Sequence, residues 1–273
     1  MKVITPLPLP CQDSLSSYMN LAQRVLEGEL MDDPSLSVER HERALVGLRR
    51  VNLWSGTASV LATAIRNHFL TKRFSSSSPS SDSNGLVGVT SDADRTLRVL
   101  DLACGGGDVT LQLAKRLAMD HQQVEVIGWD RSPTAISIAQ SSAEKAKIGN
   151  VRFEVHDVLA DDFGTEFDVI MSTLFLHHLS QAEGTKLLAK MHSAARHLML
   201  IDDLRRTRFG LLLAHVACRI LTRSPIVRVD GPMSVRAAFR ESEVQVLASE
   251  AGLPRPIIQR HWPQRFLLQW GHS

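Results

Sequence analysis

The sequence predicts an α/β protein whose core is a mainly parallel sheet, and three observations lead to this prediction. Short apolar runs typical of buried strands alternate with helical patterns from Val99 to Asp203. The first run leads directly into three consecutive glycines that open a helix. Acidic or other polar residues stand at the ends of these runs. Strands that alternate with helices form parallel sheets with right-handed crossovers, and such sheets bind ligands at the carboxyl ends of their strands.

The first strand and its turn span Val99 to Asp108, with the sequence VLDLACGGGD. Glycines in a tight turn let the backbone approach a ligand closely and adopt positive φ angles. Apolar residues then recur at helical spacing from Val109 to Leu117. The glycines are consecutive and Asp101 precedes them, whereas a dinucleotide site has G-x-G-x-x-G and an acid about 20 residues later. The turn therefore indicates a nucleotide-type cofactor, but not NAD.

The turn resembles the first motif of the class I S-adenosylmethionine-dependent methyltransferases. Asp101, Ala103, Gly105 and Gly107 fit that motif's order of an acid, a small residue and G-x-G, with Cys104 inside the turn. The resemblance implies S-adenosylmethionine as cofactor and S-adenosylhomocysteine as product. An acid at the end of the strand suits the α-ammonium group of the cofactor, and the glycines leave room for its amino-acid and ribose parts.

The next two runs support this interpretation. Val124–Asp130 ends in an acid, and a carboxylate there can accept both ribose hydroxyls through its two oxygens. A helix is expected from Ser132 to Ala146. The run Val151–Val158 again carries an acid near its end, Asp157, which the resemblance places near the adenine amino group, with Val158 offering a backbone amide. The residues expected to bind the cofactor are Asp101, Ala103, Cys104, Gly105, Gly107, Asp130, Arg131, Asp157, Val158 and Ser172.

A fourth strand, Phe167–Ser172, leads into the sequence TLFLHHL, which resembles the fourth motif of the same family. A helix from Gln181 to Ala195 and a fifth strand, His197–Asp203, follow. Methyl transfer needs a general base only if the nucleophile must lose a proton. His177 and His178 are the candidates for that role, although a histidine after a buried strand is also a common structural hydrogen-bonding residue.

The segment after the fifth strand is expected to form a lid over an apolar pocket. It combines Arg205, Arg206 and Arg208 with an apolar run, Phe209–Leu221, and continues to Arg236. The sequence D-L-x-R at 203–206, the apolar run and the sequence D-G-P-x-S-V-R-x-A-F at 230–239 resemble a subgroup of small-molecule methyltransferases related to quinone and polyketide tailoring enzymes. Arg205 and His215 are the candidate substrate-binding residues. Contact of the apolar run with a membrane surface is the alternative.

The C-terminal part predicts a helix, Glu241–Ala251, and two strands, Ile257–Trp262 and Arg265–Trp270, around Pro263. The resemblance implies that this pair is an antiparallel hairpin that completes a Rossmann-like, seven-stranded, mostly parallel sheet with helices on both faces. The core then spans residues 96–273, with the lid insertion near 204–236.

Residues 1–70 are expected to form an N-terminal helical cap, with helical patterns at 19–29, 38–52 and 54–69. A flexible serine-rich linker, residues 71–95, follows, because its composition cannot bury apolar area.

Composition limits the class of protein. A net charge of +2 without basic runs argues against a nucleic-acid partner, and three scattered cysteines give no disulfide framework. No metal-ligand spacing is found among the histidines, so no metal is predicted. No apolar run is long enough to span a bilayer, and a cytoplasmic protein is expected. The oligomeric state is left open.

These observations together predict O-methylation of a hydroxylated, largely apolar small molecule, a phenolic or polyketide-derived product of secondary metabolism. C-methylation of a quinone precursor is the alternative within the class. A non-catalytic protein that keeps the fold and serves as a partner in a biosynthetic complex is the alternative from another class.

Overall fold

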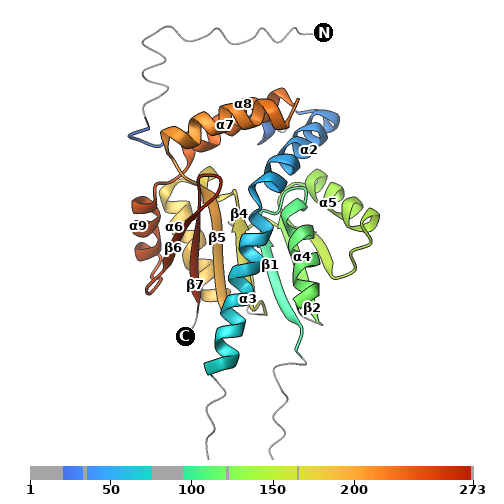
Figure 1. Cartoon of the computed structure of the whole chain (residues 1–273), viewed down its shortest axis with the longest axis vertical. Coiled ribbons are helices and arrows are strands. Elements are labelled where there is room, and N and C mark those ends of the chain that lie inside the picture. The colour runs from blue at the N-terminus through green and yellow to red at the C-terminus, as the bar shows by residue number, and fades with distance from the viewer. Residues whose placement is uncertain (1–20, 33–35, 76–94, 121–122, 165, 272–273) are drawn as a thin grey trace, which may run out of the picture.

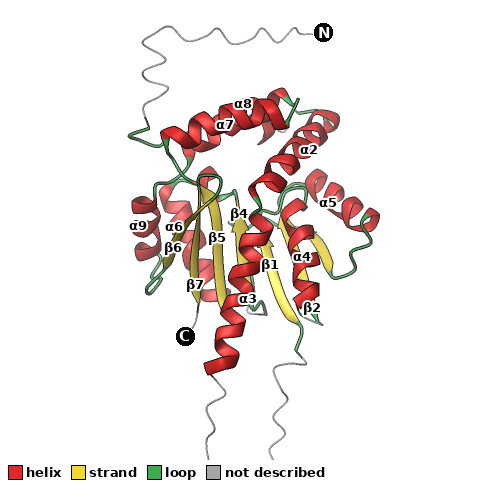
Figure 2. Ribbon diagram, viewed as in Figure 1, coloured by secondary structure: helices red, strands yellow, loops and turns green. Residues whose placement is uncertain are grey.

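A computed structural model describes residues 21–32, 36–75, 95–120, 123–164 and 166–271. Its centre is a seven-stranded sheet in the order β3-β2-β1-β4-β5-β7-β6 (Figures 1 and 2). Neighbouring strands from β3 to β5 pair in parallel, β7 runs antiparallel to β5, and β6 runs antiparallel to β7. The predicted mostly parallel sheet with a C-terminal antiparallel hairpin is confirmed. Its strands are β1 (Leu97–Leu102), β2 (Val124–Asp130), β3 (Val151–Val155), β4 (Val169–Thr173), β5 (Leu198–Leu204), β6 (Ile257–His261) and β7 (Arg265–Gly271).

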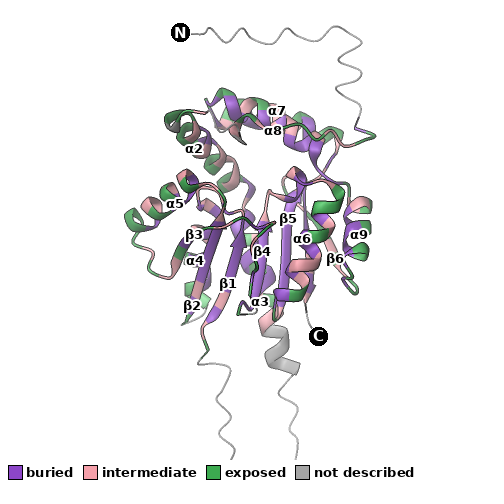
Figure 3. Ribbon diagram, turned by 180° about the vertical axis from the view of Figure 1, so that it is seen from behind, coloured by how far each residue is buried: buried purple, intermediate pink, exposed green. Residues whose placement is uncertain are grey.

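Helices cover both faces of the sheet, because side chains along a strand alternate between its two faces. In β1, Leu97 and Val99 pack with α3 and α4, whereas Leu100 and Leu102 belong to the cluster that α6 and α9 complete on the other face (Figure 3). The α5 helix lies against β2 and β3. These helices are α3 (Thr57–Ser75), α4 (Asp108–Asp120), α5 (Pro133–Lys145), α6 (Gln181–Ala194) and α9 (Glu241–Glu250).

Local signals in the sequence fix where several helices begin. The side chain of Ser132 accepts a hydrogen bond from the Ala135 amide at the start of α5, and Ser180 and Glu183 form a capping box at the start of α6. Gly56, with φ 69°, separates α2 (Val38–Ser55) from α3. The two helices thus match the expected patterns at 38–52 and 54–69, and α3 continues into the range predicted as linker. The remaining linker residues, 76–94, lie outside the described residues.

Two further helices lie across the carboxyl ends of the strands (Figure 1). They are α7 (Arg208–Leu221) and α8 (Pro225–Ala237), and we call the pair the lid. The α7 helix matches the predicted apolar run. The sequence did not predict α8 as a helix, because it contains Gly231 and Pro232. A Cβ at Gly231 would overlap Cys218 Sγ, so this glycine lets α8 pack closely against α7.

The expected helix over residues 19–29 is wrong for the part that the structure describes. Residues 21–29 form no regular element and are followed by one short turn of 3-10 helix, η1 (Leu30–Asp32). The reason is tertiary. The Val25 amide donates to the Arg236 carbonyl, and the Asp230 carboxylate accepts hydrogen bonds from the Leu30 and Met31 amides. The lid thus satisfies backbone groups that a helix would otherwise pair internally.

None of the helices in the described ranges combines the length and the apolar character needed to cross a membrane.

Candidate active site

One large cavity, of about 700 Å³, opens between the carboxyl ends of the strands, the α2 helix and the lid. Its floor comes from the turn after β1 and the ends of β2 and β3. Its upper wall is largely apolar and comes from α2 and α7, and its lid end, beneath α8, includes Glu29 and the segment after β4 with His177 and His178. The floor includes Ala103, Cys104, Gly105, Gly106, Asp130, Arg131, Ser132, His156, Asp157 and Val158, and the upper wall includes Leu45, Leu48, Val51, Leu213, Ala214 and Ala217. The structure therefore brings most of the predicted cofactor residues and both predicted catalytic histidines to one cavity.

Two glycines of the turn have different structural roles. Gly105, with φ 55°, lines the cavity, and a Cβ there would meet nothing within 4 Å. Gly107, with φ 73°, lies behind the wall, and a Cβ there would lie 2.7 Å from the Phe153 ring of β3. Gly105 thus keeps the cavity open, whereas Gly107 lets the turn pack on the sheet. Cys104 also lines the cavity, and burial raises the pKa of its thiol well above the usual value, so the thiol stays protonated.

Asp130 stands at the cavity wall with its carboxylate held from both sides. Its Oδ2 accepts a hydrogen bond from the Gly105 amide at 2.8 Å, and its Oδ1 accepts one from the Ser132 amide at 2.9 Å. Each carboxylate oxygen has capacity for one more donor. The side chain is therefore oriented in advance to accept a pair of hydroxyls.

Asp101 is 1% exposed and lies beneath the cavity wall. Its Oδ2 accepts a hydrogen bond from Thr110 Oγ at 2.6 Å, while its Oδ1 has no hydrogen-bond partner among the described residues. Burial, together with the nearby carboxylates of Asp108 and Asp130, raises the pKa of this carboxyl to about 7 against the opposing effect of the Thr110 hydrogen bond. A cation close to the Oδ1 atom would favour the ionised carboxylate and lower this pKa.

The other predicted cofactor residues are divided between the wall and the core. Asp157 and Val158 line the cavity in the loop after β3, where Asp157 Oδ1 accepts a hydrogen bond from the Leu159 amide. Their neighbour His156 stacks on Trp129, with ring centroids 4.0 Å apart. Ser172 does not reach the cavity. It is buried in β4 and donates its hydroxyl to the Leu102 carbonyl, so it ties β4 to β1.

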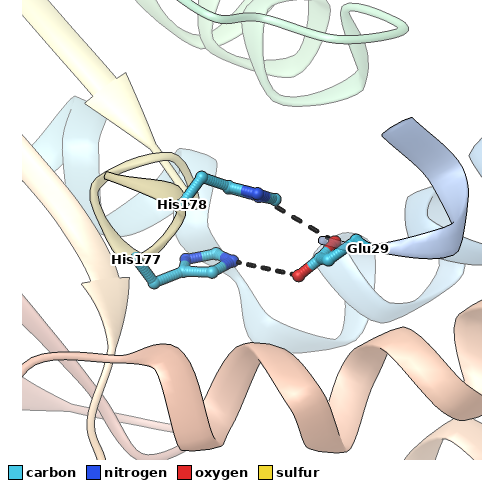
Figure 4. Close-up of side chains that lie close together, drawn as sticks. All are labelled: Glu29, His177 and His178. Carbon is cyan, nitrogen blue, oxygen red and sulfur yellow. Dashed lines mark ion pairs between the residues drawn. The ribbon is translucent and has the colours of Figure 1, made fainter. Parts of the chain in front are cut away.

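His177 and His178 lie on a short 3-10 helix, η3 (Leu176–His178), directly after β4. The His177 amide donates to Asp203 Oδ2 at 3.0 Å, and its ring Nδ1–H donates to Asp203 Oδ1 at 2.6 Å. Asp203 belongs to the neighbouring strand β5 and fixes the ring so that Nε2 points to Glu29 (Figure 4). His177 Nε2 lies 3.7 Å from Glu29 Oε1, and His178 Nε2 lies 3.9 Å from Glu29 Oε2.

Glu29 is the functional side chain that sequence reasoning missed. It comes from residues 21–32, which we call the strap, and its side chain is 10% exposed. The Ser234 hydroxyl of α8 donates to its carboxylate. Arg24 fastens the same segment by donating to the carbonyls of His177 at 3.0 Å and Leu179 at 2.9 Å. Sequence periodicity carried no signal for this placement, because the contacts join residues about 150 or more positions apart.

Opposite charges govern the titration of this cluster. Burial by itself lowers the pKa of His177, but the carboxylates of Asp203 and Glu29 outweigh burial and raise the pKa to about 10. Burial raises the pKa of Glu29, but hydrogen bonds and charge from His177 and His178 bring it below its usual value. His177 is therefore protonated at neutral pH and lies between two carboxylates.

The structure does not place the two predicted substrate residues in the cavity wall. Arg205 pairs with Glu241 of α9 and reaches Gln264. His215 is on the part of α7 that turns away from the cavity and contacts Arg219, one helical turn further along, at 3.2 Å. The apolar run forms α7, and the residues of it that line the cavity include Leu213, Ala214 and Ala217.

A family model described as a methyltransferase domain matches residues 99–197, from β1 to the start of β5. A ubiquinone biosynthesis O-methyltransferase of Azorhizobium caulinodans is 29% identical over 130 residues, which are 46% of this chain and 48% of that protein. An uncharacterized methyltransferase of Synechocystis sp. is 34% identical over 114 residues, 40% of this chain and 48% of that protein. The chain thus spans about half the length of these curated relatives.

Solved structures extend the likeness to nearly the whole chain. A putative O-methyltransferase from Nostoc punctiforme has a TM-score of 0.58 at 15% identity, covering 95% of this chain and 68% of that one. Magnesium protoporphyrin IX methyltransferase from Synechocystis, solved with S-adenosylhomocysteine, has a TM-score of 0.51 at 14% identity, covering 96% and 95%. At these identities the likeness establishes a common fold.

Proposed function

We propose that this chain, which belongs to the class I S-adenosylmethionine-dependent methyltransferases, methylates a hydroxyl oxygen of a largely apolar small molecule, such as a phenolic or polyketide-derived product. One observation carries the proposal. A single cavity connects the glycine turn and Asp130 with a cluster of ionisable groups, Glu29, His177 and His178, beneath an apolar lid. Cofactor, acceptor and proton-accepting groups would thus have places within one cavity.

The floor of the cavity fits S-adenosylmethionine. Asp130 is oriented to accept the ribose hydroxyls, Asp157 and Val158 lie where the adenine would be bound, and Gly105 leaves room for close approach. The unpartnered oxygen of Asp101 lies beneath the same turn and suits a cationic amino group. The cofactor supplies an activated methyl group on a sulfonium, so the protein mainly has to align the acceptor with it and exclude water.

The acceptor would lie between α2 and α7. Side chains there are aliphatic and small, namely Leu45, Leu48, Val51, Leu213, Ala214 and Ala217. Such a wall binds an apolar ring or chain through contact area and leaves orientation to a few polar groups. The cluster at Glu29 provides those groups, so a single hydroxyl on the acceptor would be directed to it.

The hydroxyl must lose its proton as the new O–C bond forms. His177 already holds its proton between Asp203 and Glu29, so Glu29 is the group with free capacity to accept it. His177 then acts by its positive charge, which favours an anionic acceptor oxygen, and His178 faces the other oxygen of Glu29. The catalytic role predicted for the two histidines thus becomes one shared with Glu29.

O-methylation is preferred to C-methylation because the ionisable cluster fits a hydroxyl acceptor, and because the Azorhizobium relative is named for O-methylation in ubiquinone biosynthesis. C-methylation of a quinone precursor is the alternative within the class. A non-catalytic partner protein would bind the cofactor without turning it over.

Calorimetric titration with S-adenosylhomocysteine, with NADH as control, tests the proposal first. Micromolar binding of S-adenosylhomocysteine alone is the expected result. A screen of phenols, naphthols and hydroquinones with methyl-labelled S-adenosylmethionine then separates the alternatives, since O- and C-methyl products differ in mass fragmentation. Absence of S-adenosylhomocysteine binding would overturn the proposal, and binding without methylation of any acceptor would favour the non-catalytic partner.

A further inference from the structure

We propose that Glu29, His177 and His178 form a binding site for a divalent transition-metal ion. Each of these residues offers one ligand atom, and the three atoms lie within 4.8 Å of one another (Figure 4). They come from the strap and from η3, at the end of the cavity where the acceptor would bind. The sequence predicted no metal, because the two histidines are adjacent and the carboxylate is about 150 residues away, which is not a spacing that motif searches recognise.

The surroundings of the three ligands resemble those of built metal sites. A histidine that binds a metal through one ring nitrogen usually donates the other ring N–H to a carboxylate, which fixes the tautomer and the ring plane. His177 has this arrangement, with Nδ1–H donated to the buried Asp203 at 2.6 Å and Nε2 pointing to Glu29. Glu29 is also held, by Ser234 of the lid. Two of the three ligands therefore have fixed orientations before any ion arrives, and an ion that binds would displace the proton from His177 Nε2.

The donor set decides the class of ion. Two imidazole nitrogens and one carboxylate suit Zn²⁺, Fe²⁺ or Co²⁺, whereas Mg²⁺ and Ca²⁺ prefer oxygen alone. Tetrahedral zinc bonds of about 2.0–2.2 Å place the ligand atoms about 3.3–3.6 Å from one another. The observed distances between ligand atoms, 3.7 Å from His177 Nε2 to Glu29 Oε1 and 3.9 Å from His178 Nε2 to Glu29 Oε2, are slightly longer. The strap is irregular and His178 is only half-buried, so both can make this small movement. Three protein ligands leave at least one position open toward the cavity.

The consequence is a second way to hold the acceptor. A hydroxyl oxygen bound at the open position would be fixed in place and polarised by the ion. The binding site itself does not depend on the proposed methyl transfer, since it rests on three side chains and Asp203. Its test can therefore be made without S-adenosylmethionine and without an acceptor.

The experiment is titration of chelator-treated protein with Zn²⁺ by calorimetry, together with Co²⁺, whose visible absorption reports tetrahedral coordination by nitrogen and oxygen. The expected result is one ion per chain with micromolar or tighter affinity. Glu29→Gln and His178→Ala should each weaken binding at least tenfold, while the matched control His215→Ala, outside the cavity, should bind as the parent does. Circular dichroism confirms that each variant is folded.

Two results would overturn the metal site. One is a parent protein that binds neither ion at millimolar concentration. The other is stoichiometric binding that persists in the double variant of Glu29 and His178, because the ion would then be held elsewhere, for example by cysteine thiolates.

A second inference rests on the outer face of the lid. We infer that α7 contacts the surface of an anionic lipid membrane. Phe209, Leu212, Val216 and Ile220 recur every three or four residues, so they form one stripe along the helix. Their exposed fractions are 54%, 60%, 45% and 76%. Scattered exposed apolar residues are ordinary, but a continuous stripe along one helix indicates a binding surface.

Charge selects the partner for this stripe. The helix has no acidic residue, and exposed arginines stand at its start and end, at Arg208, Arg219 and Arg223. An apolar stripe with cationic flanks is typical of helices that lie in the plane of a membrane surface containing anionic lipid. Leu213, Ala214 and Ala217 of the same helix line the cavity. One helix can therefore serve both as the lid and as the membrane contact that the sequence offered as alternatives. If the proposed function holds, an apolar acceptor would have a short path from the membrane surface into the cavity.

Sedimentation with vesicles tests this inference. The protein should pellet with vesicles of phosphatidylcholine and phosphatidylglycerol and remain in solution with phosphatidylcholine alone. Replacing Leu212 and Ile220 together by glutamate should abolish pelleting, whereas Met119→Glu, at an 86% exposed site on α4, should not. A parent protein that stays in solution with both vesicle types would overturn the inference. So would loss of a dimer in light scattering as the only effect of the α7 changes, since the stripe would then join two copies of the chain.

Discussion

The two ends of the cavity differ in how the chain builds them. At the floor, each side chain stands at the end of its own strand, and the order of strands in the sheet brings Asp130 and Asp157 beside the turn after β1. At the lid end, the strap delivers Glu29 to histidines about 150 residues away through contacts with α8 and η3. Local sequence thus determines the floor, whereas only tertiary contacts determine the lid end. Side chains at the lid end can therefore be replaced without altering the contacts that form the floor.

The largest effect should separate chemistry from cofactor binding. Glu29→Gln removes the proposed proton acceptor, and loss of general-base catalysis costs about 10²- to 10⁴-fold in turnover. The affinity for S-adenosylhomocysteine should stay within twofold, because the floor is untouched. Steady-state kinetics with the identified acceptor and calorimetry measure the two quantities. Glu39→Gln, at an exposed position in the first turn of α2 that does not line the cavity, is the control and should keep full turnover.

If Glu29→Gln weakened the binding of S-adenosylhomocysteine as strongly as it slowed turnover, the floor and the lid end would act as one unit. This result would contradict their separation into two regions.

A glycine tests the structural basis of the floor. Gly107→Ala forces a Cβ against the Phe153 ring at 2.7 Å and imposes a φ of 73° on a residue that disfavours it. Backbone strain and overpacking together should lower the free energy of unfolding by about 2–4 kcal/mol. Urea denaturation measures this change. Gly149→Ala, where the added Cβ meets nothing within 4 Å, should change stability by much less. Equal losses in both variants would contradict the packing role given to Gly107.

The same contrast explains what could be predicted from the sequence. Strand periodicity, the glycine turn and acids at strand ends depend on neighbours in the chain, so the strands and several residues of the floor, such as Asp130 and Asp157, could be predicted, whereas the antiparallel hairpin was implied by the family resemblance. The strap was predicted as a helix because its apolar spacing is helical, yet Asp230 and Arg236 of α8 bind its backbone instead. Arg205 was predicted to bind the substrate because it is a cation next to the lid. Its ion pair with Glu241 joins two different elements and could not be read from the sequence. Hydrophobic periodicity carries no information about which side chains of distant elements will pair.

The buried carboxyl of Asp101, beneath the floor, should make the stability of the fold depend on pH. Because burial raises its pKa to about 7, the folded chain binds this proton more tightly than the unfolded chain, whose aspartate has a pKa of about 4. Stability from this group is therefore full below pH 4 and is lost as the pH rises to about 7, by about 2–3 kcal/mol between pH 5 and pH 8. Asp101→Asn cannot ionise, so its melting temperature should match that of the parent below about pH 4 and should exceed it by more at pH 8 than at pH 5. An equal difference at both pH values would show that Asp101 is not protonated in the fold.

The smallest effect concerns Asp130, and it sharpens the comparison most directly. Asp130→Ala removes a charged acceptor that Gly105 and Ser132 hold in place for the ribose. A hydrogen bond to a charged group contributes about 1.5–3 kcal/mol, so the affinity for S-adenosylhomocysteine should fall at least tenfold. Asp120→Ala, a surface carboxylate paired with Arg66, is the control. Zinc binding at the lid end should be the same in Asp130→Ala as in the parent, because Asp130 ends β2 whereas Glu29, His177 and His178 come from the strap and η3. A variant that lost both ligands would mean that the floor supports the lid end, and the two regions would then have to be treated as one site.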